Sequence, residues 1–255
     1  MILRAITRAV SPALANCELT HLIREAIDAR IAAEQHRQYE ECLATLGCRI
    51  HRLPAEPDLP DSVFVEDTAI VLDELAIITR PGAASRQPET TSIARALAPY
   101  RKLVHISAPG TIDGGDVLRI DRTIYVGISG RSNEAGVGQM SSLLEPFGYT
   151  VKGVPVAGCL HLKTAVTLVA HDTLLVNPDW VEAQLFGRMR VIETDRSEPF
   201  AANALLVGAT LIYPAGFPAT QKRLEDDRIN VVTVTVTELA RAEGGVTCCS
   251  LIFSA

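Results

Sequence analysis

Short apolar runs separated by tight polar turns recur along this chain. Residues 68–72 are apolar, Asp73 and Glu74 form a polar pair, and residues 75–79 are apolar again, which is typical of a β-hairpin. A segment with helical periodicity follows near 89–98. The same design is predicted again at 117–127 with a helix near 134–145, at 166–176, and at 204–213 with a helix near 221–227.

The two ends of the chain are expected to complete the pattern. A fifth unit starts with a strand at 249–253, which must pair with an N-terminal strand at 2–9, and the longest helical segment spans 26–46. Five helix-bearing units closed head to tail are therefore predicted. A polar residue stands just before the first strand of each unit, at its mouth, and we expect these five opening residues, or openers, to face one central site. These openers are spaced about 40 to 50 residues apart, as in repeat architectures; they are Asp67, Asp116, Thr164, Asn203 and Cys248.

Composition narrows the function classes. With 255 residues of which 47% are apolar, the chain can bury a large core, and we expect one catalytic domain over residues 1–255. The net charge of −6 argues against nucleic-acid binding and favours a cationic small molecule. No apolar run approaches the ~20 residues of a membrane span, and the first residues lack a signal-peptide core. We therefore expect a cytoplasmic protein without membrane contact.

The six cysteines are expected to be reduced, because the chain is large and carries no secretion signal. No C-x-x-C pair occurs, and we expect no metal site. Taken alone, a cysteine is more often a small buried apolar residue. The position of Cys248 after Gly244 and Gly245, at the mouth of a unit, favours a nucleophile instead. Cys249 should point to the opposite strand face, into the core.

A histidine and several acidic residues supply further candidate chemistry. His161 lies in an apolar run, where a histidine is usually a core residue, but its place near the third opener favours proton transfer. Arg86 and Arg131 follow the second strand of units one and two, where a pair could hold a carboxylate bidentately. Acidic residues cluster at two openings, where they are either turn residues or a grip for a guanidinium; they are Asp61, Glu66, Asp67, Asp113 and Asp116.

Five short strings follow one another along the chain: Pro60–Asp67, Ile78–Gly82, Asp113–Leu118, Leu160–Thr164 and Gly244–Ser250. In this order they resemble the strings of the dimethylarginine dimethylaminohydrolase family, within the guanidino-group-modifying superfamily. The resemblance implies a five-bladed α/β propeller with pseudo-fivefold symmetry, built of ββαβ-type repeats. It also implies hydrolysis of Nω-methylated arginine to citrulline and an alkylamine, with neither a metal nor an organic cofactor.

The resemblance also implies roles for individual residues. Cys248 would be the nucleophile, His161 the general acid and base, and Asp113 the carboxylate that orients His161. Glu66 and Asp67 would hold the guanidinium nitrogens. The other implied substrate-binding positions are Asp61 and the carbonyl of Ala242 for the α-amine, Arg86 and Arg131 for the α-carboxylate, Phe64, and Leu19 on a mobile lid.

Two other functions stay open on the sequence. An arginine deiminase-type hydrolase would act on free arginine, although those enzymes are far longer and carry an inserted helical domain. A non-catalytic propeller that binds cationic amino acids is the second alternative, and the intact set of Cys248, His161 and Asp113 argues against it. A methylated arginine is the expected small-molecule partner, and a homodimer is one option for the assembly.

Overall fold

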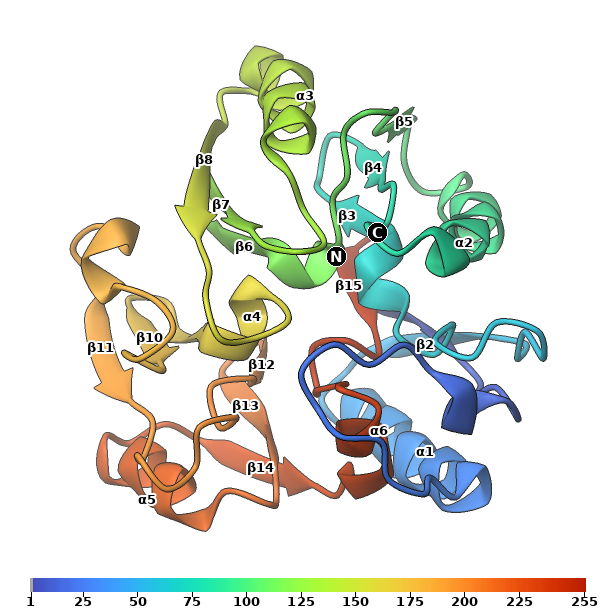
Figure 1. The fold of residues 1–255 in the computed structure, drawn as a ribbon. Coiled ribbons are helices and arrows are strands. Elements are labelled where there is room, and N and C mark those ends of the chain that lie inside the picture. The colour runs from blue at the N-terminus through green and yellow to red at the C-terminus, as the bar shows by residue number, and fades with distance from the viewer. Residues whose placement is uncertain (1) are drawn as a thin grey trace.

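A computed structural model describes residues 2–255 as a ring of five three-stranded sheets around a central axis (Figure 1). In each sheet two neighbouring strands are antiparallel, and the middle strand pairs in parallel with the third. The strands are β1 (Leu3–Arg8), β2 (Arg49–Leu53), β3 (Ala69–Val71), β4 (Ala76–Ile78), β5 (Leu103–His105), β6 (Val117–Ile120), β7 (Thr123–Ile128), β8 (Thr150–Pro155), β9 (Val166–Ala170), β10 (Thr173–Val176), β11 (Arg190–Glu193), β12 (Leu205–Val207), β13 (Thr210–Pro214), β14 (Val231–Val234) and β15 (Leu251–Ser254).

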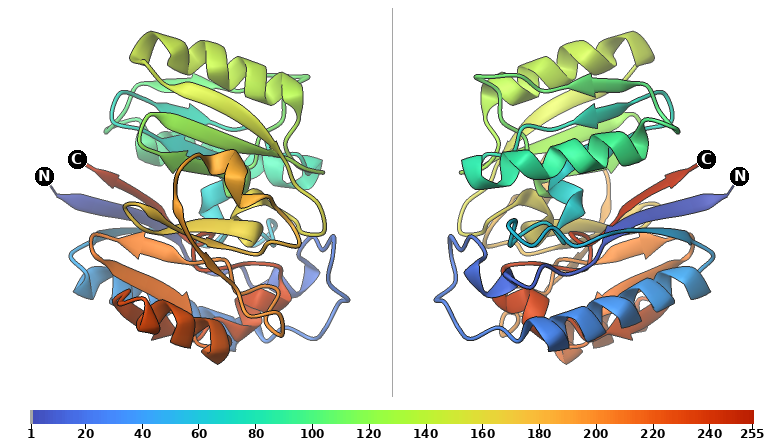
Figure 2. Two further views of the ribbon diagram at one scale, coloured as in Figure 1. Left: turned by 90° about the vertical axis from the view of Figure 1, so that its left-hand side faces the viewer. Right: turned by 90° about the vertical axis from the view of Figure 1, so that its right-hand side faces the viewer.

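The ring closes between the two ends of the chain, which confirms the predicted head-to-tail arrangement. Strand β15 pairs antiparallel with β1, with Ser254 opposite Leu3 and Leu251 opposite Ile6. Both termini consequently emerge at the same end of the molecule (Figure 2). The predicted strand at 249–253 begins later than expected, because residues 246–249 form a turn in which the Cys248 N–H donates to the Gly245 carbonyl at 3.2 Å.

The long α-helices lie on the outside of the ring (Figure 1), and local signals in the sequence set their ends. The Asp28 carboxylate caps α1 by accepting from the N–H groups of Arg30 and Ile31, and Asn133 caps α3 in the same way. The helices are α1 (Ala29–Thr45), α2 (Thr90–Leu97), α3 (Glu134–Leu144), α4 (Leu162–Ala165), α5 (Pro218–Asp226) and α6 (Thr237–Arg241), with 3₁₀ turns η1 (Leu14–Asn16), η2 (Val65–Thr68), η3 (Ala84–Glu89), η4 (Gly114–Asp116), η5 (Glu145–Phe147) and η6 (Ala183–Phe186).

The expectation that every unit carries a helix is wrong for the third unit. Between β10 and β11 the structure has only the short 3₁₀ turn η6. Pro178 and Gly187 interrupt this connection, and the positive φ of 81° at Gly187 ends η6 there. Within residues 2–255, no helix is long and apolar enough to cross a membrane.

Candidate active site

The openers of the five units meet at the centre of the ring, as predicted. Three of them accept a hydrogen bond from the backbone of the next unit, which ties neighbouring sheets together. Thr164, Asn203 and Cys248 line a central cavity. The linking bonds run to Asp67 Oδ1 from the Gly115 N–H at 2.8 Å, to Asp116 Oδ1 from the Leu162 N–H at 2.9 Å, and to Asn203 Oδ1 from the Thr247 N–H at 3.2 Å.

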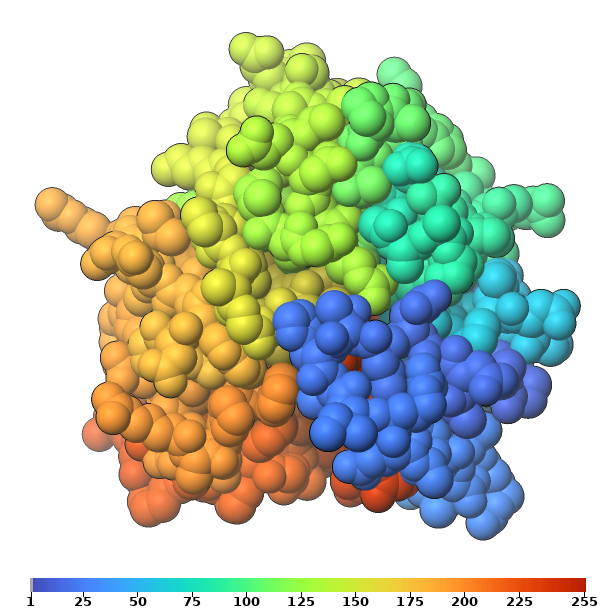
Figure 3. All heavy atoms as spheres, viewed as in Figure 1, coloured from blue at the N-terminus to red at the C-terminus, as the bar shows by residue number. Residues whose placement is uncertain are grey.

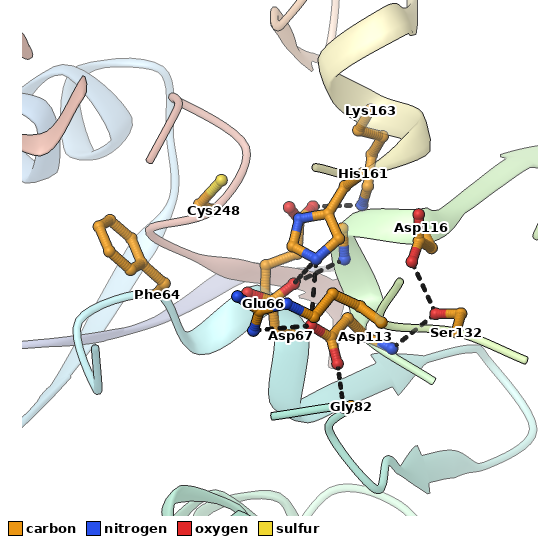
Figure 4. A network of polar contacts seen from close by, with 12 residues as sticks. Phe64, Glu66, Asp67, Gly82, Asp113, Asp116, Ser132, His161, Lys163 and Cys248 are labelled. Carbon is orange, nitrogen blue, oxygen red and sulfur yellow. Dashed lines mark hydrogen bonds and ion pairs between the residues drawn. The ribbon is translucent and has the colours of Figure 1, made fainter. Parts of the chain in front are cut away.

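His161, at the start of α4, is buried between carboxylates (Figure 4). Its Nε2 lies 3.0 Å from Asp113 Oδ2 and 4.0 Å from Asp67 Oδ1. Burial opposes a charged ring, but Asp67, Asp113 and Asp116 outweigh it and raise the pKa of His161 to about 9. This pKa favours an imidazolium at neutral pH.

Asp113 is held in place for this pairing. Its Oδ1 accepts from the Gly82 N–H at 2.8 Å, and its own N–H donates to Ser132 Oγ at 3.0 Å. Together with Asp67 and His161 it forms a group of ligand-type atoms within 4.8 Å of one another. These carboxylates already accept from donors of the protein, so the arrangement fits an imidazolium held by acidic residues.

Two glycines are required by close contacts at the site. A Cβ on Gly115 would lie 2.6 Å from His161 Nδ1 and 2.9 Å from Asp67 Oδ1. A Cβ on Gly244 would lie 2.2 Å from the ring of Phe64. Gly115 and Gly244 thus allow the backbone to approach side chains of the site more closely than any other residue could.

Arg86 is buried and ion-paired on two sides. Its Nη1 donates to Asp67 Oδ2 at 2.6 Å, and its Nη2 donates to Glu89 Oε2 at 2.9 Å. The same Nη2 reaches the carbonyl of Phe64 at 3.0 Å. Although burial opposes ionisation, His161 and Arg86 lower the pKa of Asp67 to about 2. Arg86 therefore fixes Asp67 as an anion, a contact that the sequence reasoning did not anticipate.

Glu66 forms the floor of the central cavity with Lys163. The Lys163 ammonium is ion-paired with Glu66 Oε1, and Thr247 Oγ1 donates to Glu66 Oε2 at 2.8 Å. Lys163 had no predicted role, although it lies two positions after His161, where the backbone turns into the third unit. The polar residues Lys163 and Thr164, which closely follow the candidate catalytic histidine, were the sequence signal that could have indicated a role for Lys163.

Cys248 lies on the turn before β15, apart from the carboxylate cluster (Figure 4). Its Sγ accepts from the Gly245 N–H at 3.2 Å. Burial, Glu66 and Asp67 raise the pKa of Cys248 to about 12, so the free protein carries a neutral thiol. Cys249 is in the core, as expected, although a turn rather than strand alternation separates the two thiols.

Two cavities meet at Cys248 and His161. The larger cavity is about 210 Å³ and the smaller about 20 Å³, and both are lined by Leu160, His161, Glu243, Gly244 and Cys248. The smaller cavity also brings together most of the predicted substrate-binding residues, namely Asp61, Phe64, Asp67, Arg86, Arg131 and Ala242.

The N-terminal segment 18–22 covers these cavities, and Figure 3 shows the blue segment over the centre of the ring. The Glu243 carboxylate accepts from the N–H groups of Thr20 at 3.0 Å, His21 at 2.6 Å and Leu22 at 2.6 Å. The apolar side chain of Leu19 packs against the core and lines neither cavity. The lining side chains of this segment are those of Glu18, His21 and Leu22, which carry no sequence signal of their own.

The covering segment also contacts two predicted substrate-binding residues. Asp61 Oδ2 accepts from the Glu18 N–H at 3.1 Å. Arg131 Nη2 donates to Thr20 Oγ1 at 3.0 Å. The segment is thus fastened to the polar side of the site as well as to Glu243.

Fold and site together define a class of protein: a pseudo-fivefold α/β propeller with a cysteine, a histidine and carboxylates around a central pocket. The family model described as N,N dimethylarginine dimethylhydrolase, eukaryotic, matches residues 18–253. The chain is 41% identical to N(G),N(G)-dimethylarginine dimethylaminohydrolase of Streptomyces coelicolor over 97% of this chain and 96% of that protein. This chain belongs to the dimethylarginine dimethylaminohydrolase family.

Solved structures agree with this assignment. DDAH from Pseudomonas aeruginosa, a cysteine-to-serine variant complexed with citrulline, superimposes with a TM-score of 0.95 at 35% identity, over 99% of this chain and 100% of that chain. A histidine-to-glycine variant of dimethylarginine dimethylaminohydrolase, an adduct with S-methyl-L-thiocitrulline, superimposes with a TM-score of 0.93 over the same shares, also at 35% identity. The predicted fold class is confirmed.

Proposed function

We propose that this chain hydrolyses asymmetric dimethylarginine and monomethylarginine to citrulline and an alkylamine. The observation that carries this proposal is the position of Cys248 and His161 where two cavities meet, with Glu66 lining the larger cavity and Asp67 the smaller one. A thiol, a proton donor and anions around one point suit attack on the carbon of a cationic guanidinium. The similarity to named dimethylaminohydrolases supports the same reaction.

The amino-acid end of the substrate is assigned to the residues that line the smaller cavity, which must widen beyond its volume of about 20 Å³ to admit it. Asp61 and the carbonyl of Ala242 take the α-amine, while Arg131 and Arg86 face the α-carboxylate from the same cavity. Arg86 remains ion-paired with Asp67 and Glu89 while it faces the carboxylate. Arg131 is therefore the more available of the two cations, and we assign it the larger share of carboxylate binding.

Substrate binding prepares Cys248 for attack. The guanidinium adds positive charge beside a thiol whose pKa is raised to about 12 by burial, Glu66 and Asp67. This charge favours release of the thiol proton to solvent. The thiolate then forms a C–S bond to the guanidinium carbon. His161 donates its proton to the alkylated nitrogen, the C–N bond breaks, and the neutral amine leaves a covalent thiouronium on Cys248.

The second half of the reaction reverses the role of the histidine. Neutral His161 accepts a proton from water, and the resulting hydroxide forms a C–O bond to the thiouronium carbon. As the C–S bond breaks, the hydroxyl proton of the adduct passes to the departing sulfur through solvent, so neutral citrulline leaves and Cys248 returns to the thiol. This scheme draws on no metal or organic cofactor. The closed ring further supports the proposal that residues 1–255 form one catalytic domain, and six free cysteines support a reducing, cytoplasmic location.

Citrulline release tests this assignment. The purified protein is mixed with dimethylarginine, monomethylarginine or arginine, and we expect turnover of the methylated substrates in preference to arginine. Equal turnover of free arginine would indicate a deiminase, and no citrulline from any of the three would indicate a binding protein. Cys248→Ser should lose about 10⁴-fold or more in kcat. The matched variant Cys249→Ser should retain substantial activity, because Cys249 is in the core.

A further inference from the structure

The larger cavity changes character along its length. Its inner wall carries Glu66, His161 and Cys248, the groups assigned to the reaction. Away from these residues the cavity is lined mostly by apolar side chains from the covering segment and from the fourth and fifth units. These are Leu22, Phe200, Pro214, Phe217, Val236 and Ala240.

The position of this apolar part relates it to one end of the substrate. The two cavities share His161 and Cys248. When the amino-acid end lies beside Asp61 and Arg131, and the guanidinium carbon is at Cys248, the alkylated nitrogen points onward into the larger cavity. A cavity measured in this way needs roughly 10–15 Å³ to hold one water molecule, which is about as large as a methyl group. A cavity of about 210 Å³ has room for several such groups.

The charged side chains of this cavity are engaged with the protein. Glu66 and Lys163 pair with each other, and Glu243 accepts from three backbone N–H groups of the covering segment. A polar or charged substituent would lose its hydration here without these partners, whereas an alkyl chain gains burial against the rings of Phe200 and Phe217.

We propose that the larger cavity is a specificity pocket for the Nω-substituent and for the departing amine, and that it accepts linear alkyl groups longer than methyl, up to about butyl. This inference rests on the proposed hydrolysis of Nω-alkylated arginine. Phe200 and Phe217 determine the preference for apolar substituents. Phe200 is supported by Trp180, whose ring centroid lies 5.2 Å away, and Phe217 precedes α5.

Steady-state kinetics with Nω-methyl-, Nω-propyl- and Nω-butyl-L-arginine test the proposal. Citrulline release reports all three reactions equally. A buried methylene contributes ~0.8 kcal/mol, so we expect KM to fall about 3- to 4-fold for each added carbon while citrulline is still formed. Phe200→Ala should lower the ratio of kcat/KM for the butyl substrate to that for the methyl substrate by about 10-fold, and Phe217→Ala should lower it in the same direction.

Phe147 provides the matched control. Its exposed fraction is 39%, the same as that of Phe200, but it lies next to α3 in the second unit. Phe147→Ala should leave the butyl-to-methyl ratio unchanged. Hydrolysis of the methyl substrate alone, or a ratio indifferent to Phe200→Ala, would overturn the inference and leave the proposed function standing. If no substrate yields citrulline, the proposed function fails, and this inference fails with it.

Discussion

The two cavities that meet at Cys248 and His161 are built from different kinds of residues on the same scaffold. The smaller cavity draws most of its charged side chains from the first two units, with Asp61, Asp67 and Arg131 among them. The larger one takes its apolar rings mainly from the fourth unit. Under the proposed assignment, the charged side orients a zwitterion, and the apolar side selects substituents by size and polarity.

The comparison also shows what each side needs for stability. Buried charges are tolerated only when paired and hydrogen-bonded, and Asp67, Arg86 and Glu89 satisfy one another in this way. The apolar side needs only burial, which tolerates substitution more readily when volume is kept. Changes in the charged half should therefore cost far more activity than changes in the apolar half.

Among variants that test this comparison, the largest effect is expected at His161, which the charged half holds as an imidazolium. His161→Gly should lower turnover of methylarginine by about 10²–10⁴-fold, because the leaving amine loses its proton donor. S-methyl-L-thiocitrulline should be affected less in the first step, since a thiol leaves with less help. The raised pKa of about 9 keeps His161 protonated through neutral pH, so wild-type turnover should fall as the pH rises past that value.

The control for this variant is His171→Gly, in the same unit. The His171 side chain is 90% exposed and lies in a hairpin turn, so its loss should not change the rate. Mass spectrometry of the His161→Gly protein after mixing with the thiocitrulline should show an adduct on Cys248. Wild-type steady-state rates in His161→Gly would reduce His161 to a core residue.

Gly115→Ala should have the next largest effect. The new Cβ would lie 2.6 Å from His161 Nδ1, so the ring must move from its position beside Asp113. Displacement of a catalytic group by about 1 Å can cost ~10²-fold in rate, and we expect a loss of that order in kcat. In Gly138→Ala, by contrast, the Cβ meets nothing within 4 Å, and activity should be retained. Comparable kcat in the two variants would show that the charged half is more adaptable than its packing indicates.

The fold was largely predictable from the sequence because its pattern repeats. Paired apolar runs and polar openers such as Asp67 and Asp116 locate the strands of the first two units, and β1 closes the ring as expected. The strands of the third unit were located as well, but its missing helix was not expected, although Pro178 and Gly187 interrupt the connection between β10 and β11. A turn instead of a strand at Cys249 also depends on local hydrogen bonds.

The composition of the site was predictable to a lesser degree. Residues such as Asp113 and His161 could be singled out because they stand in polar strings at unit openings. The partners of Arg86 could not, because Asp67 and Glu89 meet its guanidinium only through the tertiary fold. The contact between Glu243 and residues 20–22 joins segments from opposite ends of the chain, and no local pattern reports it.

Arg131 tests how the charged half recognises the amino-acid end. Loss of a charge-assisted hydrogen bond costs ~1.5–3 kcal/mol, so Arg131→Ala should raise KM for methylarginine by about 10- to 100-fold. Nω-methylagmatine, which lacks the carboxylate, should be a poor substrate of the wild type and no poorer for the variant. Arg190→Ala, which removes an exposed pair with Asp227, is the control and should change neither value. Equal efficiency with both substrates in the wild type would remove the carboxylate contact from the assignment.

The smallest effect is expected at the segment 18–22, which covers both cavities. Glu243 has a positive φ of 58°, which is uncommon for a non-glycine residue, and its carboxylate accepts from the N–H groups of Thr20, His21 and Leu22. Glu243→Ala removes these acceptors, so amide hydrogen exchange at these three residues should accelerate by about 10-fold or more, and KM should rise by a few-fold.

Glu198→Ala is the matched variant, because the Glu198 carboxylate likewise accepts from backbone N–H groups, those of Ala219 at 2.9 Å and Thr220 at 2.8 Å. It should speed exchange at α5 and leave the covering segment protected. If exchange at Thr20–Leu22 is unchanged in Glu243→Ala, the cover is held by its contacts with Asp61 and Arg131 alone. In that case the charged half would close the site by itself, and the contrast between the two cavities would extend to the segment above them.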